Sequence, residues 1–233
     1  MINNKSNNTS ANSSHALASK RKVFIVDDHP IVRQGLAQLV DNEPDLVVCG
    51  QGEDAYQALA AIRAAKPELV LLDVSLKDAN GLELLKEIKA FNPGVLVLML
   101  SMHDESLYTE RALRAGANGY IMKQEAPGAL LDAIRKVLAG KVYVSEKMGA
   151  TLLQRMVGGK KNLGELPMDR LTDRELEVFR MIGAGQSVKE IADKLILSAK
   201  TVEAHREHIK EKLNFKSSAE LLRFAIRNEP GAR

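Results

Sequence analysis

The chain has 233 residues, of which 45% are hydrophobic and 27% charged, and its formal net charge is +3 at pH 7. This composition is typical of a globular protein with one large or two small domains, and so small a charge does not by itself indicate a polyanionic partner. The single cysteine, Cys49, excludes an internal disulfide and no apolar run is long enough to span a membrane, so we expect a cytoplasmic protein that does not insert into membranes.

The first residues of the chain, 1–20, are rich in Asn and Ser and contain no apolar segment. Such a segment cannot bury enough apolar surface to fold, and it lacks the apolar centre of a signal peptide. We therefore expect a disordered tail.

From there to about residue 139, short apolar runs alternate with segments that carry apolar residues at helical spacing. The expected strands are 23–26, 46–49, 69–73, 95–100 and 119–122, and the expected helices are 30–40, 55–65, 81–91, 105–115 and 130–138. Short, unbroken apolar runs are typical of strands buried on both faces. Their alternation with helices predicts an α/β domain with a doubly wound, five-stranded parallel sheet. Gly50 and Gly52 are expected to end the second strand.

Polar side chains follow four of these strands. Asp27 and Asp28 come after the first strand, and the third ends in Asp73; Ser101 and Lys123 follow the fourth and fifth. Each has an ordinary structural explanation, such as a turn or a helix start. Because the carboxyl ends of parallel strands share one edge of a sheet, we nevertheless expect these groups to meet there.

Three carboxylates at one edge repel each other unless a cation lies among them. Asp28 and Asp73, together with the backbone carbonyl of Ser75, would supply few protein oxygens and leave room for water, which favours Mg²⁺. Lys123 could pair with Asp73, and the Ser101 hydroxyl could donate to the same group. A carboxylate nucleophile, a divalent cation and a fixed ammonium group are the components needed to accept a phosphoryl group.

With these residues in place, the segment 22–138 resembles a response-regulator receiver domain, whose fold is flavodoxin-like. The resemblance is carried by the following residues: Asp27, Asp28, Asp73, Ser101, Tyr120, Lys123 and the turn at 78–84. Two positions depart from the pattern, since Lys77 and Gln124 stand where many receivers have Pro.

The resemblance implies phosphotransfer to Asp73 from a sensor histidine kinase. It also implies that Asp27 contacts the Mg²⁺ ion through water, that Ser101 moves toward the phosphoryl group, and that Tyr120 then turns inward behind it.

A linker is expected between two domains. Residues 141–156 carry Met148, Leu152, Leu153 and Met156 on one side of a possible helix, and residues 157–162 combine Gly with charge and show no periodicity. Such a segment is typical of a flexible tether. We divide the chain into a tail (1–20), a receiver domain (21–139), a linker (140–166) and a second domain (167–233).

The second domain has the start signals of four short helices. Thr172, Ser187 and Ser217 are each followed three residues later by Glu, which is the capping-box pattern, and Ser198 is a cap without the acidic partner. Only Ile196 and Leu197 separate the second helix from the third. So tight a joint predicts a helix-turn-helix, although a plain helical bundle would give the same pattern.

The third of these helices has a polar outer face. Val202, Ile209 and Leu213 fall on one side, and charged or small residues occupy the other. Such a helix can enter the major groove of DNA. The alternative is a solvated face held by the i,i+3 pairs Glu203–Arg206 and Glu207–Lys210.

The segment 171–226 resembles the LuxR-type helix-turn-helix of the NarL/FixJ class. The match runs through 171–175, 189–192, 200–205, 212–213 and 219–221. The resemblance implies contacts with double-stranded DNA by Lys189, Lys200, Thr201, Glu203, Ala204, His205, Arg206, Glu207 and Lys210. It also implies a homodimer contact on the last helix at Leu221, Leu222 and Ala225.

The sequence thus predicts a two-component response regulator and not an enzyme. Phosphorylation of Asp73 by a histidine kinase would release a mutual obstruction between the domains, free the recognition helix and favour a dimer on DNA. One alternative is a phosphohydrolase that forms an aspartyl-phosphate, but such enzymes carry a second Asp where this chain has Ser75. The other alternative is a DNA-binding regulator that works without phosphorylation.

Overall fold

The computed structural model describes residues 20–76, 80–102, 105–157 and 167–228, so the expected tail and tether lie almost entirely outside the described residues. The strands are β1 (Arg21–Val26), β2 (Leu46–Gly52), β3 (Leu69–Asp73), β4 (Leu96–Ser101) and β5 (Gly119–Met122). The helices of the first domain are α1 (Pro30–Asp41), α2 (Ala55–Ala65), α3 (Gly81–Phe91), α4 (Glu105–Arg114) and α5 (Pro127–Leu138). After these come α6 (Glu146–Val157), the short 3-10 helix η1 (Pro167–Arg170), α7 (Asp173–Gly183), α8 (Val188–Leu195), α9 (Ala199–Leu213) and α10 (Ser218–Arg227).

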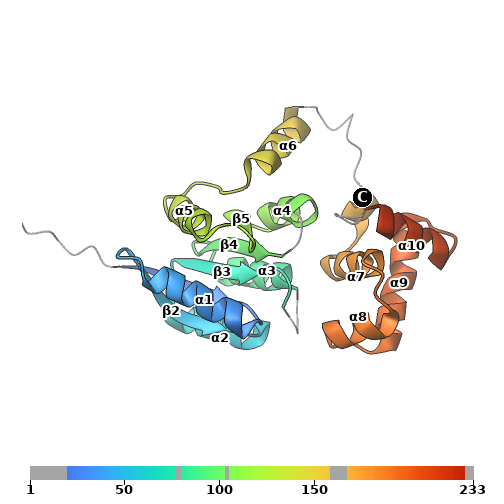
Figure 1. Cartoon of the computed structure of the whole chain (residues 1–233), viewed down its shortest axis with the longest axis horizontal. Coiled ribbons are helices and arrows are strands. Elements are labelled where there is room, and N and C mark those ends of the chain that lie inside the picture. The colour runs from blue at the N-terminus through green and yellow to red at the C-terminus, as the bar shows by residue number, and fades with distance from the viewer. Residues whose placement is uncertain (1–19, 77–79, 103–104, 158–166, 229–233) are drawn as a thin grey trace, which may run out of the picture.

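The five strands form one parallel sheet in the order β2-β1-β3-β4-β5 (Figure 1). Alternate residues of the central strands face opposite layers, since Ile25 and Leu71 pack with the helices α1 and α5, whereas Val70 and Leu72 pack on the side of α2, α3 and α4. The predicted doubly wound sheet is therefore confirmed. Its strands are apolar on both faces because helices pack on both sides of the sheet.

Strand β2 is longer than expected, because it continues through Gly50 and ends at Gly52. The ring of Phe24 from β1 lies directly over Gly50, where any added Cβ would collide with the ring. Glycine here allows a close approach inside the sheet and does not terminate the strand.

Residues 141–145 are not helical, and α6 begins only at Glu146. Tyr143 instead runs beside β5, where its carbonyl accepts from the N–H of Tyr120 and its N–H donates to Asn118. These hydrogen bonds form a single parallel β-bridge beside β5 before the chain leaves the first domain.

The second domain is all-helical, and α7, α8, α9 and α10 begin after Thr172, Ser187, Ser198 and Ser217 as predicted. The capping boxes at Thr172 and Ser187 are complete. The expected box at Ser217 is only half formed, because the carboxylate of Glu220 accepts from the N–H of Lys216.

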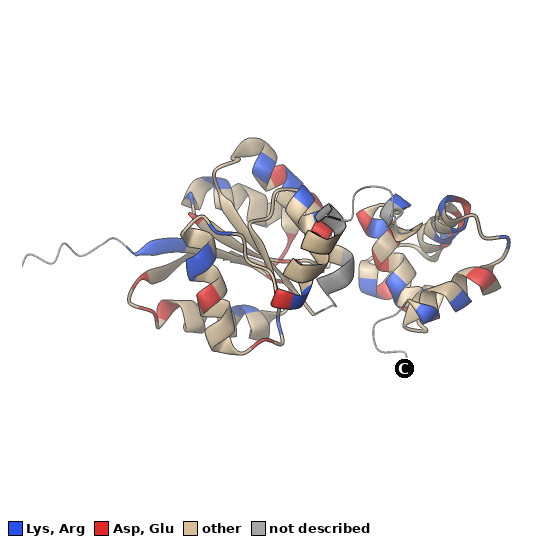
Figure 2. Ribbon diagram, turned by 90° about the horizontal axis from the view of Figure 1, so that it is seen from above, with Lys and Arg blue, Asp and Glu red and all other residues tan. Residues whose placement is uncertain are grey.

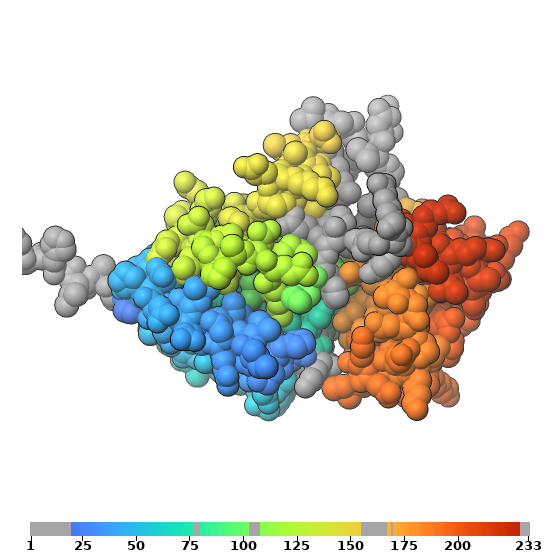
Figure 3. Space-filling view, viewed as in Figure 1, coloured from blue at the N-terminus to red at the C-terminus, as the bar shows by residue number. Residues whose placement is uncertain are grey.

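The second domain lies against the carboxyl edge of the sheet, with α7 nearest to the first domain (Figures 1 and 3). Lys86 of α3 and Arg111 of α4 both pair with Asp173 at the start of α7. Within the described part of the chain, no helix is both long and apolar enough to cross a membrane.

Candidate acidic site and candidate nucleic-acid interface

The carboxyl edge of the sheet gathers the acidic residues that the sequence placed there. Asp27, Asp28 and Asp73 are at most 9% exposed, and ligand atoms of these three residues and of His29 all lie within 4.8 Å of one another. His29 was not among the predicted site residues, although its position directly after two acidic residues was a signal. Its Nδ1 lies 2.6 Å from Asp28 Oδ1.

Lys123 supplies the positive charge of the cluster. Its Nζ lies 2.7 Å from Asp73 Oδ2 and 2.6 Å from Asp27 Oδ2, and its backbone N–H donates to the carbonyl of Ser101 at 2.8 Å. Burial lowers the pKa of Lys123, but the charges of Asp73 and Asp27 outweigh burial and raise the pKa overall. The ammonium group therefore stays protonated and fixed between the two carboxylates.

Burial is also the main influence on the pKa of Asp73. It raises the pKa of Asp73 to about 6, although Lys123 and the N–H of Ser75 act in the opposite direction. One ammonium group thus offsets three carboxylates only in part. In addition, Asp27 Oδ2 and Asp28 Oδ1 are buried, and their described contacts are with Lys123 Nζ and His29 Nδ1. This donor set, rich in carboxylate oxygens and short of positive charge, fits a hard divalent cation.

The loop after β3 is held close to the acidic cluster. The N–H of Ser75 donates to Asp73 Oδ1 at 3.2 Å, and Ser75 forms a β-bridge with Asn80, which caps α3. Gly81 follows Asn80 and packs against the carbonyl of Asp73, where a Cβ would not fit. Ser75 therefore contacts both the Asp73 carboxylate and the residue that caps α3.

Ser101 ends β4, and Tyr120 lies in the neighbouring strand β5, two residues before its end; both are fully buried. In this structure the Tyr120 ring already lies inside the protein. The inward position that the sequence analysis expected only after phosphorylation is therefore the position found here.

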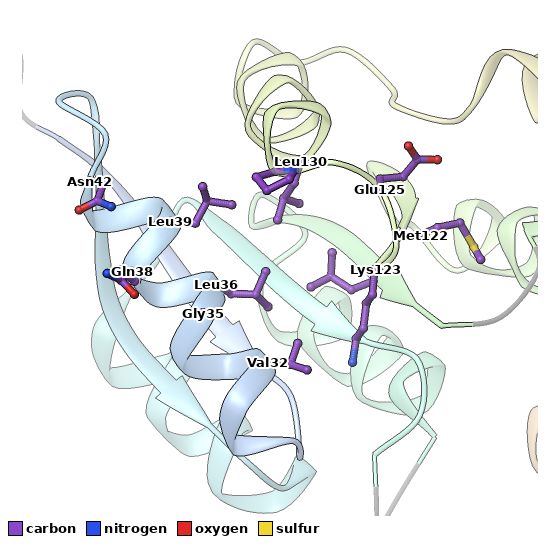
Figure 4. A pocket seen from close by; sticks show the side chains of 12 residues that line it. Val32, Gly35, Leu36, Gln38, Leu39, Asn42, Met122, Lys123, Glu125 and Leu130 are labelled. Carbon is purple, nitrogen blue, oxygen red and sulfur yellow. The ribbon is translucent and has the colours of Figure 1, made fainter.

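A cavity of about 440 Å³ separates α1 from α5 and ends at Lys123 (Figure 4). Its walls are mostly apolar, with Val32, Leu36 and Leu39 on α1 and Leu130 on α5. Figure 4 shows the Lys123 side chain extending along the cavity. Its aliphatic stem thus lies in apolar surroundings while its ammonium group reaches the carboxylates.

The candidate nucleic-acid interface is the outer face of α9. Seven residues of α9 are exposed: Ala199, Lys200, Glu203, Ala204, Glu207, His208 and Glu211. Thr201, His205, Arg206 and Lys210 are half-buried on the flanks, and Lys189 is exposed in the first turn of α8. The residues predicted to contact DNA therefore lie on one helix and the start of its neighbour.

Ion pairs occupy part of this face. Arg206 pairs with Glu203 at 3.0 Å, and Lys210 pairs with Glu207 at 2.8 Å. Figure 2 shows acidic and basic residues intermixed over the whole second domain. Both cations would have to leave their carboxylates to reach phosphates, which favours modest and salt-sensitive binding.

The predicted dimer contact on α10 needs correction. Leu221 and Ala225 are at most 1% exposed, because they pack into the core of the second domain. They cannot supply a surface between two protomers. Of the predicted residues only Leu222 is exposed, and Ile226 one turn later is exposed beside it.

Two families match the two halves of the chain. Residues 23–135 match the response regulator receiver domain, and residues 169–225 match the bacterial regulatory proteins of the LuxR family. The chain is 35% identical over 212 residues to the oxygen regulatory protein NreC of Staphylococcus carnosus, covering 89% of this chain and 98% of that protein. It is 36% identical over 213 residues to NreC of Staphylococcus aureus, with the same coverage.

Two solved structures are similar to this chain, one over most of its length and one over 60% of it. RcsB from Salmonella enterica serovar Typhimurium, bound to the promoter rprA with the phosphomimetic BeF3−, is 27% identical, with a TM-score of 0.60 over 89% of this chain and 98% of that chain. A LuxR-family two-component response regulator from Aurantimonas is 32% identical, with a TM-score of 0.56 over 60% of this chain and 99% of that chain. The predicted family is thereby confirmed: the chain belongs to the two-component response regulators that join a receiver domain to a LuxR-type DNA-binding domain, which are transcription regulators and not enzymes.

Proposed function

We propose that Asp73 accepts a phosphoryl group from a sensor histidine kinase and that the phosphorylated chain binds double-stranded DNA as a homodimer to regulate transcription. The observation that carries this proposal is the Asp73 carboxylate itself. It lies buried among two further carboxylates and is held by Lys123 at 2.7 Å. A carboxylate needed only for folding would have no reason to share a pocket with two others.

In the transfer, a carboxylate oxygen of Asp73 attacks the phosphorus atom of a phosphohistidine. The new O–P bond forms as the P–N bond breaks, and the imidazole leaves with the bonding electron pair and takes up a proton. Lys123 offsets the charge that builds up on the phosphoryl oxygens. Ser101, the last residue of β4 next to β3, would donate a hydrogen bond to the product.

Asp28, Asp73 and the carbonyl of Ser75 would hold Mg²⁺ directly, and Asp27 through water. The ion, when bound, neutralises charge shared between the phosphoryl oxygens and Asp73. His29 lies beside these ligands and positions Asp28 through the 2.6 Å contact between its Nδ1 and the carboxylate.

At the second domain, the exposed centre of α9 would meet base edges in the major groove. Lys200, Glu203, Ala204 and Glu207 would face base edges, and Arg206 and Lys210 would contact phosphates. Lys189, Thr201 and His205 lie at the rim of the same face. Leu222, on the exposed side of α10, would belong to the homodimer surface.

The test of the acceptor is Asp73→Asn. Wild-type protein treated with phosphoramidate and Mg²⁺ is expected to gain the mass of one phosphoryl group, and the variant is expected to gain none. Asp132→Asn, which changes an exposed carboxylate on α5, is the matched control and should behave as wild type. A phosphoryl group on the Asp73→Asn protein would show that another residue is the acceptor.

The same variant distinguishes regulation by phosphorylation from the remaining alternative, a DNA-binding regulator that works without phosphorylation. If phosphoramidate treatment strengthens DNA binding by wild type but not by Asp73→Asn, regulation depends on phosphorylation. Equal binding by treated and untreated wild type would favour a regulator that works without it.

A further inference from the structure

Helix α1 begins at a histidine whose side chain takes no part in capping the helix. His29 is the N-cap residue, and its side chain makes no capping hydrogen bond with the described residues. Its imidazole ring is 63% exposed, so packing does not hold it either. The ring nevertheless lies against the acidic cluster, since its Nδ1 is 2.6 Å from Asp28 Oδ1 and 3.4 Å from Asp27 Oδ1. Neither capping nor burial accounts for this position.

The backbone holds His29 beside the carboxylates. Its N–H donates to Asp27 Oδ1 at 2.9 Å, and Pro30 follows in the first turn of α1. Because the residue before a proline is confined to extended backbone, the main chain at His29 has little freedom, although the exposed ring can still turn. The imidazole therefore stays within reach of the cluster.

Lys123 and His29 contact different oxygens of this cluster. Lys123 Nζ lies beside Asp27 Oδ2 and Asp73 Oδ2, whereas His29 Nδ1 is nearest to Asp28 Oδ1. A protonated amine has no lone pair for a metal ion, but an imidazole nitrogen has one. A cation among the carboxylates would therefore find a nitrogen ligand at His29.

The spacing of the four residues suits a single ion. Ligand atoms of Asp27, Asp28, His29 and Asp73 all lie within 4.8 Å of one another. Opposite ligands of an octahedral divalent cation are about 4.2 Å apart, which is twice a bond length of about 2.1 Å. A small turn of the exposed ring therefore suffices to bring Nδ1 to the ion. In the part of the chain that the structure describes, no second group of three or more His, Cys, Asp or Glu side chains is gathered in this way.

A nitrogen ligand changes which ion the site prefers. Mg²⁺ takes oxygen ligands and keeps several of its waters, so an imidazole adds little to its binding. Zn²⁺ and its neighbours in the first transition series accept imidazole nitrogen together with carboxylate oxygen. Asp28, His29 and Asp73 thus form a mixed nitrogen and oxygen donor set that suits these ions.

We infer that His29 makes the acceptor site a binding site for a divalent transition cation, which competes there with Mg²⁺. The inference rests on the proposed function for the position of the ion beside Asp73, and it names the class of ion that competes for this position. Both ions need Asp28 and Asp73, so only one of them binds at a time. His29 is then a ligand of the transition cation and a positioning residue for Mg²⁺.

The experiment measures binding of Zn²⁺ and of Mg²⁺ to the full chain by calorimetry, in wild type and in His29→Ala. The matched control is His208→Ala, which removes an exposed histidine from α9. Asp28→Asn identifies the part of the signal that comes from the acidic cluster. The same proteins are then loaded with Mn²⁺ for pulsed EPR, which detects a nitrogen atom bound to the ion.

His29→Ala is expected to weaken Zn²⁺ binding by at least about tenfold, since residues that only support a metal ligand already contribute this much. Its Mg²⁺ affinity is expected to fall by less than about threefold, because Mg²⁺ gains little from the nitrogen. Bound Mn²⁺ should show nitrogen coupling in wild type and in His208→Ala, and none in His29→Ala.

Equal losses of Zn²⁺ and Mg²⁺ affinity in His29→Ala would overturn the inference, because His29 would then only position Asp28. Unchanged Zn²⁺ binding, or Mn²⁺ without nitrogen coupling in wild type, would overturn it as well.

Failure of this inference differs from failure of the proposed function, which is tested by the gain of phosphoryl mass with Mg²⁺. A phosphorylated protein whose Zn²⁺ binding does not depend on His29 would contradict the inference alone. A protein that binds Zn²⁺ through His29 but is not modified by phosphoramidate would contradict the proposed function alone.

Discussion

At the scale of single residues, the acidic site depends on one cation. Lys123 contacts both Asp27 and Asp73, and few other groups offset the repulsion between these buried carboxylates. Its stem is held in the apolar cavity beside α1, so the ammonium group has little freedom to leave. Electrostatic stabilisation from such a fixed, dehydrated charge is worth more than from a charge in water.

Replacement of Lys123 by Met keeps the length of the stem and removes the charge. We expect phosphorylation by phosphoramidate to slow by about 100-fold, the effect of losing one preorganised charge or donor. The rate is measured from the gain of phosphoryl mass with time. Lys141→Met, on the exposed surface after α5, should leave the rate unchanged; a wild-type rate in Lys123→Met would remove Lys123 from the mechanism.

At the scale of elements, the joint between α8 and α9 is the most constrained part of the DNA-binding domain. Ile196 ends α8 in the left-handed region with φ 52°, where its N–H donates to the carbonyl of Ala192. A β-branched residue is strained in this region. Because the Ile196 side chain is 65% exposed, its burial contributes little stabilisation to offset the strain. The tight turn between the two helices is what imposes this conformation.

Ile196→Asn should therefore stabilise the domain. Asn tolerates the left-handed region, and relief of the strain is expected to raise the free energy of unfolding by about 1 kcal/mol. Urea unfolding followed by circular dichroism gives the value. Ile226→Asn, also exposed but in the regular helix α10, should produce no such gain. Equal effects from the two variants would show that Ile196 is not strained.

At the scale of the whole molecule, the two domains meet through long polar side chains and a few buried ones. Interfaces of this kind between domains commonly allow relative motion. Glu177 is the buried carboxylate of this contact. Burial raises its pKa, although Arg174 and Asn80 act in the opposite direction, and the charge of Glu83 adds to the rise.

Separation of the domains would expose Glu177 and return its pKa toward the ordinary value of 4.5. The closed form therefore binds the proton more tightly, so closing is favoured as pH falls toward the raised pKa and is disfavoured above it. We expect the radius of gyration to decrease as the pH is lowered toward the raised pKa of Glu177, and Glu177→Gln to flatten this dependence. Glu211→Gln, exposed on α9, should keep the wild-type dependence.

Much of the fold could be predicted because it depends on local patterns. The apolar runs that end at Val26 and Asp73 form strands of a sheet that is covered on both faces. The caps at Thr172 and Ser187 fix the starts of two helices through contacts within three residues. The convergence of Asp28, Asp73 and Lys123 followed from parallel topology alone, since that topology brings every strand end to one edge.

Other features depend on contacts between residues that no pattern connects. Gly50 stays inside β2 because of a ring on the neighbouring strand, and Leu221 belongs to the core because α10 is rotated toward α7. Two such contacts join the domains, one between Arg111 and Asp173 and the other between Glu177 and Asn80. In the sequence, each of these residues looks like an ordinary polar or charged surface residue. The sequence by itself determined the two domains and the chemistry of each. Only the tertiary structure decided that the contact between the domains lies beside the acidic site and leaves the outer face of α9 exposed, because that contact depends on shape and charge on residues more than sixty positions apart in the chain.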